Sequence, residues 1–323
     1  MESVSSMSKK RIFIPLAGIL LALIALAVVF VSRATADLAD HLVEERIVAA
    51  SRTAQAYLDN LKERNLITTR VIAASQSIIE YVSNWNNNVN RAQSRGGLSL
   101  YLSSLKIDYG MTDIVVTDRE GNVVLRTYDP HRYGDSGLAL PPVTAALLHG
   151  EASVNYAATA NMQVGLSSTA PILDNGDAIG AITAMVNMGT IEFVESLARI
   201  LNAAVTVFSG YTSVASTLYL QPGIRAIGTH AAPHIREAVI EQGQEVKIPL
   251  ALFGIPHHAF YFPLMGWGDA PVGMFFVGIS TLRPIDATDM LQRNIIFIGI
   301  ASLVVLALAL IVYEAFKHDS SAA

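Results

Sequence analysis

The chain of 323 residues contains no cysteine. Disulfide bonds are therefore excluded, and the stability of the fold must come from a packed hydrophobic core. A chain of this length can build such a core, and it is long enough to divide it between two units.

Basic residues are also scarce. Lys and Arg number 22 against 27 Asp and Glu, which gives a net charge of −5, and no basic patch stands out. Nucleic-acid binding needs a concentration of positive charge, so no nucleic-acid partner is expected.

Motifs for catalysis are missing too. The sequence has no G-x-S-x-G, no H-E-x-x-H and no glycine-rich phosphate loop. Ser103 and Lys106 match the short pattern S-x-x-K, but the companion motifs of that chemistry are absent, which favours an ordinary surface helix. The sequence does not predict an enzyme, and it indicates no cofactor.

The histidines do not predict a metal site. His257 and His258 are adjacent on an expected strand and would face opposite sides. His230 and His234 have a helical metal-ligand spacing, but Pro233 is expected to begin the helix after His230.

Two long apolar runs explain the high mean hydropathy of +0.41. Residues 12–32 and 295–313 carry no charge, and each is long enough to cross a membrane as a helix. The basic cluster Lys9 to Arg11 precedes the first run, which places the N-terminus in the cytoplasm. Residues 33–293 are then expected outside the bacterial inner membrane, in the periplasm or beyond the cell.

A cleaved signal peptide is the alternative for the first run, because Ala34 to Ala36 reads "ATA". The apolar run is longer than the core of a typical signal peptide, which favours an uncleaved anchor. We therefore expect a cytoplasmic N-terminus at 1–11, transmembrane helices at 12–32 and 294–313, and a cytoplasmic tail at 314–323. So short a tail has no room for an output domain, so the output is expected from a separate cytoplasmic or membrane protein.

A stalk and a short helix are expected over residues 33–110. From Ala36 to Val82 there is no Pro or Gly, and apolar residues recur at helical spacing. The Asn-rich stretch 84–90 and "SRGG" at 94–97 are expected to break this helix, and a short helix should follow and end near Tyr109.

The stalk carries a narrow apolar stripe, formed by Leu38, Leu42, Tyr57 and Leu61. We expect its own module to leave the stripe partly uncovered. A homodimer through parallel stalk helices would bury it.

The rest of the outer region repeats itself. "PILDNGDAIGAI" at Pro171 is followed 92 positions later by "PLMGWGDAPVGMF" at Pro263. Short Val-, Ile- and Thr-rich strands surround a helix in the same order in both halves. The sequence predicts an α+β fold with two tandem antiparallel-sheet modules, at 111–190 and, with a linker helix, at 191–293.

This plan resembles the double Cache domains, PAS-like extracytoplasmic sensors of bacterial chemoreceptors and sensor kinases. The most specific stretch is "VVLRTYDPHRYGDS" at Val123 to Ser136. The resemblance implies a small-molecule ligand in the membrane-distal module. Where related carboxylate sensors carry a His and a second Arg, this chain has Tyr128 and the pair Ser167 and Ser168, so a small or mono-anionic ligand is expected.

Arg126 is the leading ligand-binding candidate. It lies two positions from Tyr128 on an expected strand, so both side chains would share one face. A guanidinium and a phenol there can hold a carboxylate. Pairing of Arg126 with a structural acid, such as Asp113 or Asp129, is the open alternative.

The other candidates lie in the loop after this strand and on neighbouring elements. Asp135 is also suited to capping a turn, and the tyrosines are also suited to a core. These candidates are His131, Tyr133, Asp135, Tyr156, Tyr101 and Lys106.

The function expected from these features is that of a transmembrane sensor that binds a small organic solute, a carboxylate or an amino acid, and signals to a partner. The alternative is a ligand-independent membrane scaffold that binds a periplasmic protein.

Overall fold

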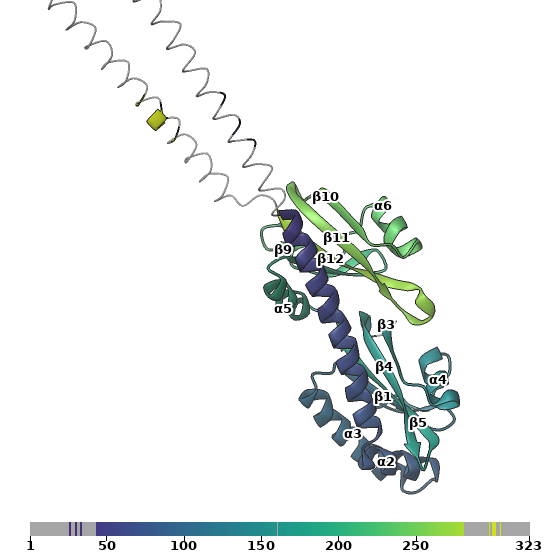
Figure 1. The fold of residues 1–323 in the computed structure, drawn as a ribbon. Coiled ribbons are helices and arrows are strands. Elements are labelled where there is room, and N and C mark those ends of the chain that lie inside the picture. The colour runs from purple at the N-terminus through teal and green to yellow at the C-terminus, as the bar shows by residue number, and fades with distance from the viewer. Residues whose placement is uncertain are drawn as a thin grey trace, which may run out of the picture. The chain divides into compact units, whose positions relative to one another are not determined.

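The computed structural model describes residues 43–159 and 161–280, with a few single positions in the two terminal segments. The chain divides into a unit formed by residues 46–279 and a unit formed by residues 1–45 with 280–323. Nearly all described residues belong to the first unit (Figure 1).

The expected membrane spans, 12–32 and 294–313, lie almost wholly outside the described residues, as does the tail 314–323. Within the described part of the chain, no helix is long and apolar enough to cross a membrane. The two spans therefore stay predictions.

A helix occupies residues 43–73 and buries one stripe against the sheets of its own chain. The buried positions recur every three or four residues, as one helical face requires: Ile47, Ala50, Ala54, Leu58, Leu61, Asn65, Thr69 and Ile72. Leu61 is 6% exposed, so the expectation that its own modules leave it uncovered was wrong. Leu38 and Leu42 lie outside the described residues.

The expected continuous helix to Val82 was also wrong. The helix stops at Ala73, and α2 (Gln76–Asn86) starts anew, with Ser75 as its N-cap. The Ser75 hydroxyl accepts a hydrogen bond from the amide of Ile78 at 3.4 Å, which satisfies one of the free donors at the helix start.

"SRGG" does not interrupt a helix, contrary to expectation, because it lies inside α3 (Arg91–Asp108). A side-chain carbon placed on Gly97 would lie 2.6 Å from the Tyr81 ring. The glycine here therefore permits the close packing of α3 on α2 instead of ending a helix.

The first sheet has five antiparallel strands in the order β2-β1-β5-β4-β3. Helix α4 (Pro141–His149) lies between β2 and β3 in the chain. The strand bounds are β1 Asp113–Thr117, β2 Val123–Arg126, β3 Ser153–Thr159, β4 Met162–Asp174 and β5 Asp177–Asn187.

Helix α5 (Ile191–Leu201) leads to a second five-stranded sheet in the order β10-β11-β12-β6-β7. Read from its other edge, this order matches that of the first sheet, with β6 and β7 in place of β1 and β2. A small hairpin of β8 and β9, then α6 (Pro233–Arg236) with the π-helix η1 (Glu237–Glu241), separates the strands as α4 does in the first half. The bounds are β6 Ala204–Ser209, β7 Thr212–Ser216, β8 Tyr219–Gln221, β9 Ile224–Arg225, β10 Val246–Leu252, β11 Ile255–Met265, the 3-10 turn η2 Trp267–Asp269 and β12 Pro271–Ser280.

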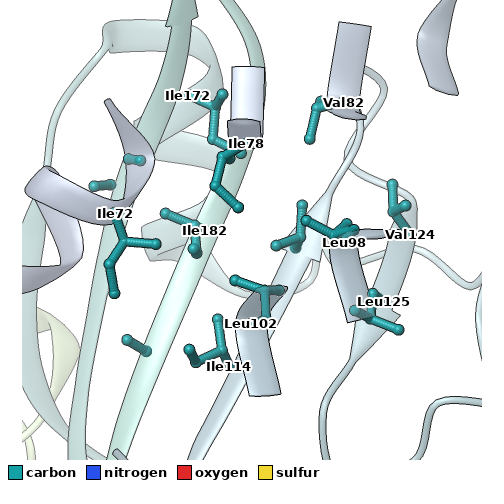
Figure 2. Close-up of a cluster of buried hydrophobic side chains, with 14 of the residues drawn as sticks. Ile72, Ile78, Val82, Leu98, Leu102, Ile114, Val124, Leu125, Ile172 and Ile182 are labelled. Atoms are coloured by element: carbon teal, nitrogen blue, oxygen red, sulfur yellow. The ribbon is translucent and has the colours of Figure 1, made fainter. Parts of the chain in front are cut away.

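One hydrophobic core fills the space between the first sheet and the helices on one of its faces. Ile72, Ile78 and Leu98 come from three helical segments and meet Ile114 and Ile182 of the sheet (Figure 2). This core occupies one face of the sheet, so a binding site in this module must lie on the other.

Candidate functional site

The face of the first sheet that lies away from this core carries a row of side chains from all five strands. Cross-strand partners share a face, and here they run Arg126, Val115, Thr183, Thr169 and Ser153. Three of the five are neutral hydroxyl residues, and one is a cation.

The next row on the same face is equally polar. It runs from Asp113 through Met185 and Ser167 to Asn155. We call these two rows together the polar face. Helix α4 covers the sheet beside it, where Val143 and Ala146 pack on Ala181.

Two groups of the polar face are buried without a hydrogen-bond partner in the described part of the chain. They are the Ser153 hydroxyl and the Asn155 side-chain amide nitrogen. Thr169 and Thr183, between them and Arg126, bond to each other at 2.9 Å. Buried polar groups are nearly always paired, so these two are suited to bind a ligand.

Arg126 is the last residue of β2 and is 8% exposed. Its guanidinium donates to Asp135 Oδ1 at 2.8 Å, to Asp135 Oδ2, and to the Arg132 carbonyl at 3.0 Å. The hydrogen bond that Arg126 donates to Asp135 is the largest cause that raises the pKa of Arg126. The structural acid beside Arg126 is therefore Asp135, and the expected partners Asp113 and Asp129 were wrong.

The expectation that Tyr128 lies on the same strand as Arg126 was wrong, because β2 ends at Arg126. Its ring is nevertheless near the guanidinium, since Tyr128 also contributes to raising the pKa of Arg126. Tyr128 is 38% exposed.

The loop that follows folds back along β2. The Val123 amide donates to the Asp135 carbonyl at 2.9 Å, and the Gly134 amide donates to the Val123 carbonyl at 2.8 Å. Arg126 lowers the pKa of the Asp135 carboxyl below its ordinary value. His131 is exposed on this loop.

Tyr133 packs toward the helices. Its ring meets the Trp85 ring edge-on at 6.1 Å, and the Arg95 guanidinium lies over it at 3.8 Å. Tyr133 therefore fixes the loop to α2 and α3 and is not brought together with the two rows.

Asp113 forms a second polar centre at the start of β1. Lys106 reaches it at 3.4 Å, Thr127 Oγ1 at 3.5 Å, and the Asn161 amide donates to its other oxygen. The structure thus brings Lys106 to the edge of the polar face through Asp113, which sequence reasoning had considered only as a partner of Arg126.

Tyr156 and Tyr101 lie on the other side of the sheet. Tyr156 pairs with Leu166 and has the Lys62 ammonium over its ring at 4.7 Å. Burial raises the pKa of its hydroxyl, and Asp59 adds to the effect. Tyr101 packs against the core of Figure 2. Neither shares a face with Arg126.

Asn65 in the middle of helix 43–73 is buried on that same side. Its amide donates to Ser168 Oγ and to the Ala184 carbonyl at 3.5 Å. Ser168 lies on β4 between Ser167 and Thr169, which face the other way.

A separate open hollow of about 450 Å³ lies between α4 and Trp267 of η2. None of the expected site residues lines it. In residues 43–159 and 161–280, no three His, Asp or Glu side chains gather around a possible metal position.

Ser153, Asn155, Thr169 and Thr183 are the residues that sequence reasoning missed. The available signal was the alternation of small polar residues along three expected strands. Only the register between the strands, which the sequence does not give, aligns them with Arg126.

Comparison with known families identifies a Cache domain. The family model described as single cache domain 3 matches residues 183–289, which cover the end of β5, α5 and the second sheet. Residues 183–289 are therefore similar to the sensor domains of the Cache family. No curated protein has a sequence that matches the chain.

Several solved sensor domains are similar in fold. The sensor domain of the V. cholerae histidine kinase DctB matches at a TM-score of 0.49 and 11% identity, covering 76% of this chain and 99% of that one. The sensory domain of the Campylobacter jejuni chemoreceptor Tlp3 with isoleucine bound matches at 0.43 and 12%, with 74% and 91% covered. The periplasmic domain of Vibrio cholerae LuxQ matches at 0.46 and 12%, with 72% and 99% covered.

Proposed function

We propose that the chain is a two-pass sensor of the bacterial inner membrane that binds a small organic solute on the polar face and signals to a separate output protein. The observation that carries the proposal is the pair of unpartnered polar groups, on Ser153 and Asn155, which share a face with Arg126 and Asp113. The proposed module boundaries are those stated above, 111–190 and 191–293.

The charges on this face indicate the class of ligand. Arg126 supplies a cation and Asp113 an anion, and both already have protein partners. The uncommitted groups, a hydroxyl and an amide, are neutral. A single carboxylate or a zwitterionic amino acid fits this set better than a dicarboxylate, which would need two free cations.

The signal is proposed to travel through the helix 43–73 on the far side of the sheet. β4 presents Ser167 and Thr169 to the polar face and Ser168 to Asn65 of that helix. A ligand that moves β4 would therefore bias the position of the helix between two arrangements. A homodimer through this helix remains part of the proposal, with its exposed outer side, Ile67 and Val71, as the contact.

A thermal-shift screen of the full chain in lipid nanodiscs tests the proposal. Short-chain carboxylates and amino acids are the compounds to use, and isoleucine is included because the Tlp3 domain is described with it bound. A ligand at 100 times its dissociation constant adds about 2.7 kcal/mol of stability. If no compound shifts the melting temperature at millimolar concentration, the protein-binding scaffold becomes the better account.

A further inference from the structure

The turn that joins β10 to β11 and the separate two-stranded sheet of β8 and β9 lie at the same end of the second sheet. β10 and β11 are joined by a turn at Phe253 and Gly254, next to the pair Leu252 and Ile255. The β8–β9 hairpin follows β7, whose last residue Ser216 lies opposite Thr206 near the start of β6.

The chain also leaves the second sheet at this end, after the last residue of β12. β12 runs antiparallel to β6, with Gly278 opposite Ala204, so its last residue Ser280 lies at the end that carries both turns. The other end of the sheet is marked by η2, which contacts β3 of the first sheet. Figure 1 shows the labels β9 and β10 at the end away from β3.

Both turns expose large apolar side chains. Phe253 and Ile255 are 44% and 46% exposed, and Tyr219 and Ile224 are 48% and 54% exposed. β10 is unusual as well, because near the turn its outward positions are Pro249 and Ala251 instead of polar residues. An edge strand with a solvated face normally carries polar or charged side chains there.

The backbone conformation of the β10–β11 turn is also unusual for an aromatic residue. Phe253 has a φ of 52° and Gly254 a φ of 81°. Such two-residue turns favour Asn or Asp at the first position, and a bulky residue there is strained. The chain thus places an exposed aromatic ring at a position whose backbone favours a small polar residue.

The distribution of acidic residues is also informative at these turns. In the segment of the β10–β11 turn the sequence has no Asp or Glu from 246 to 268, while Arg225 of the β8–β9 hairpin forms an ion pair with Glu195. An apolar tip on an acid-free segment suits the interface of a lipid bilayer. The apolar run 295–313 begins 15 residues after Ser280 in the sequence, so the end of β12 is where the second sheet is connected to any bilayer that holds this run.

We propose that the β8–β9 and β10–β11 turns form a lipid-binding surface that dips into the interface of the membrane in which the chain is anchored. This inference rests on the membrane anchoring of the proposed function. Phe253, Ile255 and Ile224 would enter the boundary between headgroups and acyl chains, and Tyr219 would lie at headgroup level, where amphipathic rings concentrate.

Site-directed fluorescence tests the proposal, since the chain has no cysteine of its own. Single cysteines at positions 253 and 219 are labelled with an environment-sensitive dye in the full chain. The protein is reconstituted into phosphatidylethanolamine and phosphatidylglycerol vesicles whose lipids carry a spin-label quencher, at a shallow depth for the turn positions and at the bilayer centre for position 304. Ile107→Cys is the matched control, because Ile107 is 80% exposed on α3 of the other module, and Val304→Cys reports the apolar run.

The expected result is loss of most of the fluorescence at 253 and 219, with none lost at 107. If 304 is quenched and both turn positions behave as 107 does, the lipid-binding surface is refuted while the membrane anchor stands. Protection of the turn labels from an aqueous quencher without quenching by lipid would identify a protein partner or a second copy, and would overturn the proposal. If 304 itself is not quenched, the anchoring fails and the inference fails with it. An Ile255→Cys label replaces position 253 if the Phe253 variant does not fold.

Discussion

The two sheets share one strand order but differ in the chemistry of the face that their helices cover. In the first sheet the face beside α4 carries Arg126, Asp113 and two unpartnered polar groups. In the second sheet the face beneath α6 and η1 is filled by Phe208, Tyr261, Met274 and Phe276. The same backbone plan therefore supports a polar site in one half and a solid apolar core in the other.

The aromatic side chains of the second sheet pack against one another. The Tyr261 ring lies 5.0 Å from the Phe276 ring and 6.3 Å from the Phe208 ring. Burial raises the pKa of the Tyr261 hydroxyl to about 12, as desolvation disfavours its charged form. Under the proposed function, the second module would contribute stability and the first module recognition.

The largest expected effect is on the stability of the second module. Phe276 is 1% exposed, so Phe276→Ala should cost about 3–5 kcal/mol of the free energy of unfolding through loss of packing and a cavity. Ser153→Ala on the polar face is the matched change and should cost almost nothing. Urea unfolding followed by Trp267 in a Trp85→Phe background measures the effect, and equal losses in both variants would contradict the contrast.

Ligand affinity should respond next, at Arg126. Arg126→Ala removes the cation and should weaken binding by on the order of 2–4 kcal/mol, roughly 30- to 1000-fold. Asp135→Asn breaks the same ion pair but keeps the guanidinium, so it should leave affinity equal or higher. Titration calorimetry with a hit from the screen measures both. If the two variants lower affinity alike, Arg126 has only a structural role.

Asn155 separates recognition from stability within the first sheet. Asn155→Ala removes an amide that has no partner, so stability without ligand should not fall, while affinity should drop by about 1–3 kcal/mol. Ser168→Ala on the opposite face should do the reverse, since it deprives Asn65 of its acceptor. Thermal melts with and without ligand distinguish the two patterns, and an Asn155 variant that melts early yet binds normally would refute the site.

The smallest expected effect is the pH dependence from Asp135. Arg126 holds the pKa of this carboxyl below its ordinary value of 3.8, so its stabilising contribution is complete above pH 3.8 and is lost as the pH falls through the lowered pKa. The Asp135 side chain is 40% exposed, so solvent screening limits the contribution to below about 1 kcal/mol. Between pH 6 and pH 2.5 the melting temperature should fall slightly less in Asp135→Asn than in the unchanged chain. An identical pH dependence of the two melting temperatures would show that the ion pair adds nothing to stability.

The repeated strands could be predicted because local signals agree there. Alternating Val, Ile and Thr, bounded by Gly, Asp and Asn turns, located nearly every strand of both sheets. The break at Ser75 was missed because nothing in its neighbourhood is a strong helix breaker; a single capping hydroxyl decides it. "SRGG" was misread because glycine signals a turn in isolation, whereas Gly97 is required by the ring of Tyr81.

The candidate site was only partly predictable. The spacing of Arg126 and the loop to Asp135 pointed to the region of the polar face, but which acid the guanidinium holds depends on how the loop folds back on β2. Tyr156 was placed with the site because it lies on β3, yet it faces the helix. Its neighbour Asn155 faces Arg126, and only the register of β3 against β4 separates the two.

The buried amide of Asn65 also limits how the helix 43–73 can travel. Sliding the helix along its axis by one residue is a shift of about 1.5 Å, enough to pull the amide off Ser168 and strand it in an apolar interior at a cost of about 1–3 kcal/mol. Small axial movements therefore take β4 along, and larger ones must reach a new partner before they become stable. The helix is expected to move in discrete steps, which would turn a graded distortion of the sheet into a switch.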